Sequence, residues 1–159
     1  MKKSLSIFLA TMFLLLSFET ASACLCFSLP DPTPEQIRTQ LNGELIKANL
    51  VFSGEVIRLD DFKVAFRVEK AWKGKTVKEI NMSTGAINNN DGTVIRTSCD
   101  YSFEMGKKYL VYATGSGKKM KTSECTGTGQ LKFSDDRIKF LQEIKLQKEK
   151  VVRSTKKKN

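Results

Sequence analysis

The sequence predicts a small, mostly β domain with a helix before and after its strands and two disulfides. Segments 50–59 and 62–72 are rich in β-branched and aromatic side chains, and in the second of them apolar and polar residues alternate, as in a half-buried strand. Segment 34–48 instead places apolar residues at helical spacing. The chain also has four cysteines, and an even number favours paired bridges in an exported protein.

Residues 1–23 have the three parts of a secretory signal peptide. Lys2 and Lys3 precede an apolar run of about 14 residues, which is short of the roughly 20 that a membrane-spanning helix needs. The small residues Ala21, Ser22 and Ala23 follow as a cleavage site. We therefore expect a cleaved, bacterial-type signal, with the domain over 24–144 and a basic, disordered tail over 145–159. The mature chain would be secreted or periplasmic.

Charge and composition exclude several functions. The formal net charge is +10; removing the signal leaves +9, of which 145–159 supply +6, so the folded part is close to +3. Binding of the tail to an anionic surface is therefore an expectation, whereas export argues against nucleic acid. The chain has no histidine, which excludes imidazole zinc ligands and Ser-His-Asp or Cys-His catalysis. We expect no enzyme, no cofactor and a monomer.

The helix at the start of the domain has a clear beginning. The three prolines at positions 30, 32 and 34 keep the chain extended up to that point. Thr33 is a predicted N-cap, Pro34 the first helical residue and Gln36 the partner that completes a capping box. The predicted core-facing residues of this helix of about 14 residues are Ile37, Leu41, Leu45 and Ala48.

The strands follow in order. The segments 50–59 and 62–72 form a hairpin through Asp60 and Asp61, and 77–84 is a third strand. A loop is expected over 87–93 and a short extended piece over 93–99. Further strands at 107–114 and 118–125 flank a Gly115-Ser116-Gly117 turn. A second helix begins after Ser134 as its N-cap, with Ile138, Leu141 and Ile144 on one face. Five short strands of this size favour an OB-like barrel, with a β-sandwich as the alternative.

The cysteines are most simply explained as two disulfides. Cys24 and Cys26 are the least suitable pair, because residues two apart in an extended chain are about 6.6 Å apart at Cα, near the upper limit for a bridge. Residues i and i+2 of a strand share a face, so both can bond to separate places on the barrel. Cys24 and Cys26 are therefore expected to pair with Cys99 and Cys125, in an order that spacing leaves open.

Other uses of these cysteines remain alternatives. A four-cysteine zinc site or a redox dithiol usually has C-x-x-C spacing, which neither pair has, so we expect no metal site. A cysteine directly after a signal can also carry lipid, which would make the protein an envelope lipoprotein. If instead cleavage leaves a free Cys24 amine, that amine and the Cys24 carbonyl oxygen can chelate one metal ion in a five-membered ring.

The cysteine and strand motifs resemble the tissue inhibitors of metalloproteinases and the wider netrin-like module. The resemblance rests on a mature N-terminal "CLC", a proline-rich lead into a helix, "ANLVFSGEVI", "SCDYSFEMGKKYLVYA" and "KTSEC", and it spans 24–133. It implies an OB-like barrel with five strands and flanking helices. It also implies the bridges Cys24–Cys99 and Cys26–Cys125.

The resemblance also implies a function. In that family the first cysteine's amine and carbonyl coordinate the catalytic zinc of a target protease. By position, Cys24 is then the chelator and Leu25 projects towards the specificity pocket, with Cys26, Thr97 and Ser98 beside it. The chain lacks the further disulfides and second domain of animal inhibitors, and netrin-like modules also bind partners without inhibiting proteases. The alternative is therefore a binding or adhesion module of the cell envelope.

Overall fold

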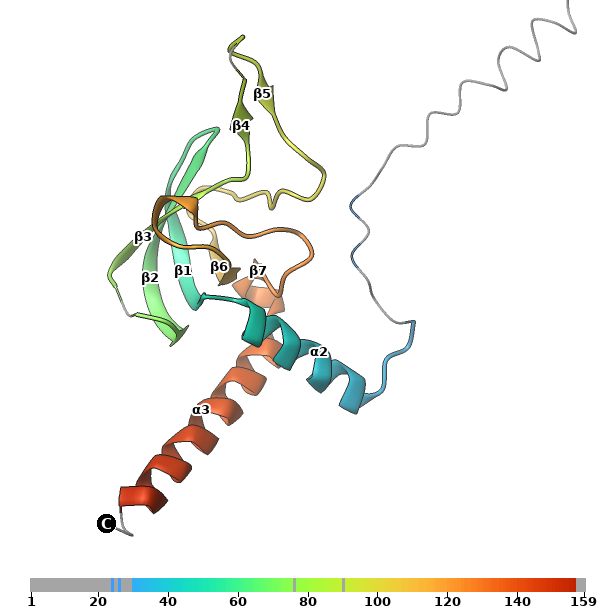
Figure 1. Cartoon of the computed structure of the whole chain (residues 1–159), viewed down its shortest axis with the longest axis vertical. Helices are drawn as coiled ribbons and strands as arrows, with labels where there is room; N and C mark the ends of the chain where they lie inside the picture. The colour runs from blue at the N-terminus through green and yellow to red at the C-terminus, as the bar shows by residue number, and fades with distance from the viewer. Residues whose placement is uncertain (1–23, 25, 27–29, 76, 90, 157–159) are drawn as a thin grey trace, which may run out of the picture.

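The computed structural model describes residues 24, 26, 30–75, 77–89 and 91–156; the predicted signal over 1–23 and Leu25 lie outside them. Helix α2 (Pro34–Lys47) precedes the strands, and α3 (Asp135–Lys156) follows them (Figure 1). The strands are β1 (Leu50–Leu59), β2 (Lys63–Lys73), β3 (Glu79–Ser83), β4 (Ile87–Asn88), β5 (Val94–Ile95), β6 (Lys108–Ala113) and β7 (Gly129–Gln130). Two short 3-10 turns are η1 (Gly117–Lys119) and η2 (Leu131–Phe133).

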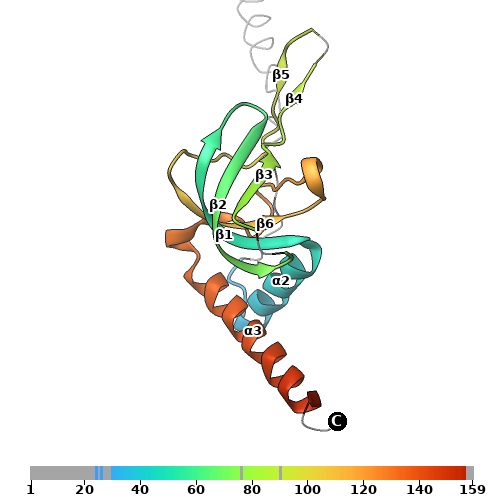
Figure 2. The ribbon, with the colours of Figure 1, turned by 90° about the vertical axis from the view of Figure 1, so that its left-hand side faces the viewer.

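Five strands form one antiparallel sheet in the order β3-β2-β1-β6-β7. Among the described strands no pairing joins β3 to β7, so the sheet is not closed through its edges. Strands β4 and β5 form a separate two-stranded hairpin that projects from the body of the molecule (Figures 1 and 2). The predicted mostly β fold with two helices is confirmed.

The sheet buries a different cluster on each face, because successive side chains of a strand point to opposite sides. On one face Phe52, Phe66 and Phe103 stack edge to face, and Tyr109 joins them. On the other face Leu110 and Tyr112 of β6 pack against both helices. The helical residues in that second cluster are Leu41, Leu45, Phe140 and Leu141.

The predicted start of α2 is confirmed in detail. Gln36 N donates to Thr33 Oγ1, and Thr33 N donates to the Gln36 side chain, which is the capping box. At the other end, Lys73 Nζ donates to the Leu45 and Ile46 carbonyl oxygens at 2.8 and 3.1 Å. A cation is stabilising at this end of a helix. Ile37 is 41% exposed and so lies outside the core.

Two local predictions are wrong. Residues 145–156 continue α3 and are not a disordered tail. Segment 118–125 is not a hairpin strand: it begins in η1 and then makes isolated bridges to two different partners. The predicted N-cap position of Ser134 is confirmed, because α3 begins at Asp135 and Ile138 N donates to the Ser134 carbonyl oxygen at 2.9 Å. The Ser134 hydroxyl itself donates to the Gln130 carbonyl oxygen at 2.9 Å. Within the described residues no helix is both long and apolar enough to cross a membrane.

Two buried tyrosines of β6 differ in how their hydroxyls are satisfied. The Tyr109 oxygen accepts a bond from Glu104 N at 3.0 Å. The Tyr112 hydroxyl is buried and has no hydrogen-bond partner among the described residues. Burial, reinforced by the charge of Glu44, raises the pKa of Tyr112 to about 12. The Tyr112 ring stabilises the core, whereas its unpaired buried hydroxyl lowers the free energy of unfolding.

We predict that Tyr112→Phe raises the free energy of unfolding by about 1 kcal/mol, because it removes an unsatisfied buried hydroxyl. The matched control Tyr109→Phe should lower it by a similar amount, because Glu104 N then loses its acceptor. Urea unfolding of the oxidised chain measures both. Equal destabilisation by the two variants would show that Tyr112 has a partner in solution.

Candidate functional site

The candidate site is the surface around the N-terminal cysteines, and two disulfides fix it. Cys24 is bonded to Cys99 and Cys26 to Cys125, each with 5.0 Å between Cα atoms. These are the two bridges implied by the family resemblance. They join the start of the chain to segments 75 and 99 residues away. In the chain-entropy model, loops of that size make each bridge worth about 4 to 5 kcal/mol.

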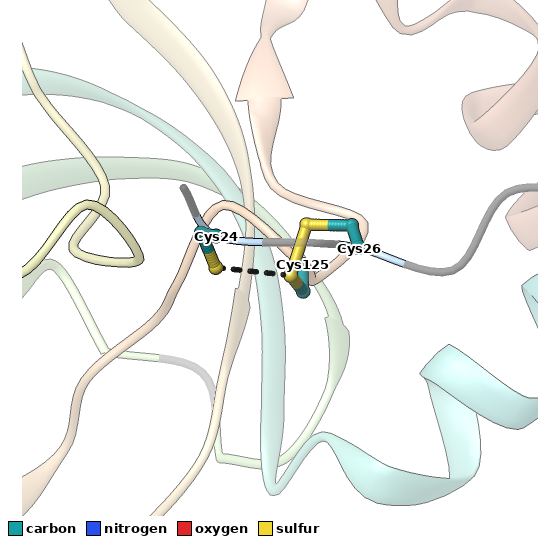
Figure 3. A group of neighbouring side chains, drawn as sticks. All are labelled: Cys24, Cys26 and Cys125. Carbon is teal, nitrogen blue, oxygen red and sulfur yellow. Dashed lines mark hydrogen bonds between the residues drawn. A yellow bond between two sulfur atoms is a disulfide. The ribbon is translucent and has the colours of Figure 1, made fainter. Parts of the chain in front are cut away.

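The two bridges touch each other. Cys24 Sγ lies 3.4 Å from Cys125 Sγ (dashed line in Figure 3). Each of these sulfurs is bonded to its own partner sulfur, so neither carries a thiol hydrogen, and the contact is van der Waals packing. The sulfurs of Cys24, Cys26 and Cys125 lie within 4.8 Å of one another. Zinc binds thiolates, so this cluster offers metal ligands only after reduction.

The segments that receive the bridges are also joined to each other through the backbone. Asp100 pairs with Ser123 in an antiparallel bridge, and Glu124 N donates to the Cys99 carbonyl oxygen at 3.0 Å. These backbone contacts hold the loops that carry Cys99 and Cys125 side by side. The spacing of Cys24 and Cys26 matches the spacing of these two anchor points.

Thr97 and Ser98 lie on the exposed surface directly before Cys99. Thr97 N donates to Asp100 Oδ2 at 2.7 Å, and Asp100 N donates back to the Thr97 carbonyl oxygen at 3.1 Å. This turn fixes the two residues beside the bridge to Cys24. The structure thus brings Cys24, Cys26, Thr97 and Ser98 onto one surface, while Leu25 lies outside the described residues.

A buried threonine cluster supports the Cys125 side of the site. The Thr122 hydroxyl donates to the Tyr112 carbonyl oxygen at 2.8 Å and lies 2.7 Å from the Thr128 hydroxyl. Thr126 Oγ1 donates to the Ser123 carbonyl oxygen at 2.8 Å. These bonds tie the turn that carries Cys125 to β6 of the core. A polar cluster satisfied in this way holds a loop in one conformation.

Sequence reasoning missed two features of this surface. Asp100 was not singled out, although it closes the turn at Thr97. The hairpin of β4 and β5, which leads into that turn, exposes Ile87, Val94 and Ile95, at 61%, 43% and 45%. Arg96 anchors the hairpin by donating to the Asp61 carbonyl oxygen at 2.9 Å. The available signal was the apolar pair on each side of the turn-rich "NNNDGT", Ala86-Ile87 before it and Val94-Ile95 after it.

No protein-family model matches the chain, and no curated protein matches it. The site therefore has to be interpreted from its own geometry. Its rigid parts are the two disulfides, the backbone bridge between Asp100 and Ser123, and the turn in which the Asp100 side chain accepts from Thr97 N. Its variable chemistry lies in the Cys24 main chain and in the exposed Thr97 and Ser98.

Gly85 provides a test of the Asp100 turn. It has φ +96°, and a Cβ there would lie 2.2 Å from Asp100 Oδ1. Gly92 has a similar φ of +82° but nothing within 4 Å of its Cβ position. Alanine at either position costs roughly 1 kcal/mol of backbone strain. Only Gly85→Ala also displaces the Asp100 carboxylate.

We predict that Gly85→Ala destabilises the fold by at least about 1 kcal/mol more than Gly92→Ala, because Thr97 N then loses its acceptor. Hydrogen exchange at Thr97 N should accelerate in Gly85→Ala alone. Urea unfolding and exchange measured on the two oxidised variants test this. Equal effects in both variants would mean that the Asp100 turn does not depend on Gly85.

Proposed function

We propose that this protein is an exported inhibitor of zinc metalloproteases, a relative of the tissue inhibitors of metalloproteinases, and that Cys24 is its zinc-chelating residue. Signal cleavage after Ala23 would convert the Cys24 amide into a free α-amine. The supporting observation is that Cys24 is bonded to Cys99, in the same loop as the exposed Thr97 and Ser98. The chelating atoms and the flanking contact residues would then form one rigid surface.

The proposed mechanism uses the open coordination position of a catalytic zinc. Such a zinc normally holds the water that attacks the substrate. The Cys24 amine and carbonyl oxygen are two ligands from one residue, and their ring with the metal would replace that water. An α-amine has a pKa near 7.7–8.0 in model peptides, and coordination to a cation favours its neutral form. The bridges restrict the Cys24 main chain before binding, which lowers the entropy lost on association.

We also propose that the five-stranded sheet curves into an OB-like barrel. An OB-like barrel of five strands would place the N-terminal segment across the ends of the sheet. Strand β1 has the irregularities that curve a sheet, with register shifts against β2 at three points. Gly54 in β1 supports this curvature, since a Cβ there would lie 2.6 Å from the Arg67 carbonyl oxygen.

The contact surface would centre on the N-terminal segment. Leu25 would enter the protease specificity pocket, and Cys26, Thr97 and Ser98 would contact the rims of its cleft. The inhibitor would need no cofactor and no metal of its own. If it does not inhibit, the remaining candidate is an envelope-binding module, which the helical extension of the basic C-terminal segment supports.

We predict that one additional alanine before Cys24 abolishes inhibition, with a loss of at least about 100-fold, because the amine is moved away from the zinc and replaced by an amide. The measurement is inhibition of a panel of zinc endopeptidases, of thermolysin type and metzincin type, with a fluorogenic peptide. Both disulfides and the unfolding free energy should be unchanged, which the same preparations report.

A second variant, Thr97→Ala, is the control for the contact surface. It keeps the amine and should weaken inhibition less than tenfold. Serine proteases should not be inhibited by either form. Unchanged potency in the alanine-extended chain would contradict the chelation mechanism. No inhibition by any form across the panel would contradict the inhibitor proposal.

A further inference from the structure

A groove lies beside the core cluster in which Leu110 and Tyr112 of β6 pack against both helices. It is a groove of about 780 Å³ between the C-terminal half of α2, the end of β2 and the part of α3 that extends beyond the sheet. Figures 1 and 2 show that α3 runs past the sheet, with its last turns away from the other elements. A volume of this size falls within the roughly 300–1,000 Å³ of small-molecule sites.

The walls of the groove differ in chemistry. The α2 wall and the β2 floor are mainly apolar, through Leu45, Ile46 and Trp72. Ile46 is 68% exposed there, although it is a large aliphatic side chain. Leu141 and Ile144 of α3 continue the apolar surface.

The α3 wall carries the charge. Lys145 and Lys148 line the groove one helical turn apart, with Glu149 as the acidic residue on the same wall. Within the described part of the chain, neither lysine has an ion pair or hydrogen bond. Over 145–156 the sequence has five basic residues and one acidic residue. The groove therefore lies at the base of a strongly basic helix.

Trp72 adds two further features. Lys70 Nζ lies 3.8 Å from the centroid of its ring, so one ring face already carries a cation. The indole nitrogen is buried and has no acceptor among the described residues. Unsatisfied buried donors are rare in folded proteins, so this corner of the groove lacks one hydrogen-bond acceptor.

We propose that this groove binds a single-chain anionic amphiphile, with the acyl chain along Leu45, Ile46 and Trp72 and a phosphate headgroup at Lys145 and Lys148. The argument is charge complementarity beside an exposed apolar wall. A phosphate monoester carries close to two negative charges at neutral pH and can accept from two ammonium groups at once. Lysines three residues apart on a helix are neighbours on its surface, so one headgroup can reach both. This site is independent of Cys24 and of protease inhibition.

Trp72 is the only tryptophan of the chain, so its fluorescence reports directly on the groove. The probe is dodecyl phosphate, kept below its critical micelle concentration and titrated into the full exported chain. Saturable binding with a blue shift of the Trp72 emission is expected. Dodecyl maltoside has the same chain with an uncharged headgroup and should bind at least about tenfold more weakly. Equal binding of the two amphiphiles would overturn the phosphate assignment.

The charge test uses two double variants of one helix. Lys145→Gln with Lys148→Gln should weaken dodecyl phosphate binding at least about tenfold, since both headgroup contacts are removed. The matched control, Lys150→Gln with Arg153→Gln, makes the same charge change on residues that do not line the groove and should change it less than threefold. Equal weakening by both double variants would mean that the basic helix attracts dodecyl phosphate through its overall charge, and it would contradict a specific headgroup site at Lys145 and Lys148.

A second pair of variants tests the apolar wall of the groove. Ile46→Ser truncates an exposed groove residue and should weaken the probe severalfold without affecting stability. Leu146→Ser changes an exposed leucine of α3 that is not among the groove residues and should have no effect.

Other occupants of the groove would give different results. Concentration-dependent dimerisation that shifts the Trp72 emission without probe would assign the groove to a second copy. Binding to anionic vesicles that is unchanged by the Lys145 and Lys148 substitutions would assign α3 to a membrane surface.

Discussion

The geometry of the N-terminal surface depends on one constraint, the pair of disulfides that holds Cys24 and Cys26 against two loops. Those loops are also paired with each other through Asp100 and Ser123, so the bridges connect the chain start to one joined platform and not to two independent segments. The contact of 3.4 Å between the Cys24 and Cys125 sulfurs shows how compact this arrangement is. Everything proposed for Cys24 requires this platform, because a chelating residue at a free chain end would lose its conformational entropy on binding.

Sequence reasoning succeeded where the determinants are local. The Thr33 and Gln36 capping box involves residues three apart, and the long strands β1, β2 and β6 are rich in β-branched and aromatic residues. It failed where the partner is distant in sequence. Segment 118–125 has the composition of a strand, but Lys121 bridges to Thr114 and Ser123 to Asp100, so the chain changes partner within three residues. The β4–β5 hairpin was hidden because turn-forming residues dominate its sequence.

The C-terminal segment shows a different reason why a prediction from sequence can fail. Its charge predicts a solvated chain, and residues 145–156 are nonetheless helical. Lys, Glu, Gln and Leu are good helix formers, and α3 is already nucleated where Phe140 and Leu141 pack on Tyr112 and Leu110. Extending an existing helix avoids the cost of nucleation. This extension creates the groove wall with Lys145 and Lys148, which composition alone could not place beside Trp72. At the N-terminal site, the cysteine spacing indicated the platform, whereas the Asp100 turn depends on a tertiary contact with Gly85.

The central claim is that the mature protein begins at Cys24 with a free amine and with both disulfides formed. The intact mass of the protein isolated from its native source, measured before and after reduction, tests it most directly. The account predicts the unmodified mass of residues 24–159, increased by four hydrogen atoms on reduction of the two bridges. A mass that includes lipid, residues before Cys24 or fewer than two bridges would contradict it, because the amine would then be blocked or the platform incomplete.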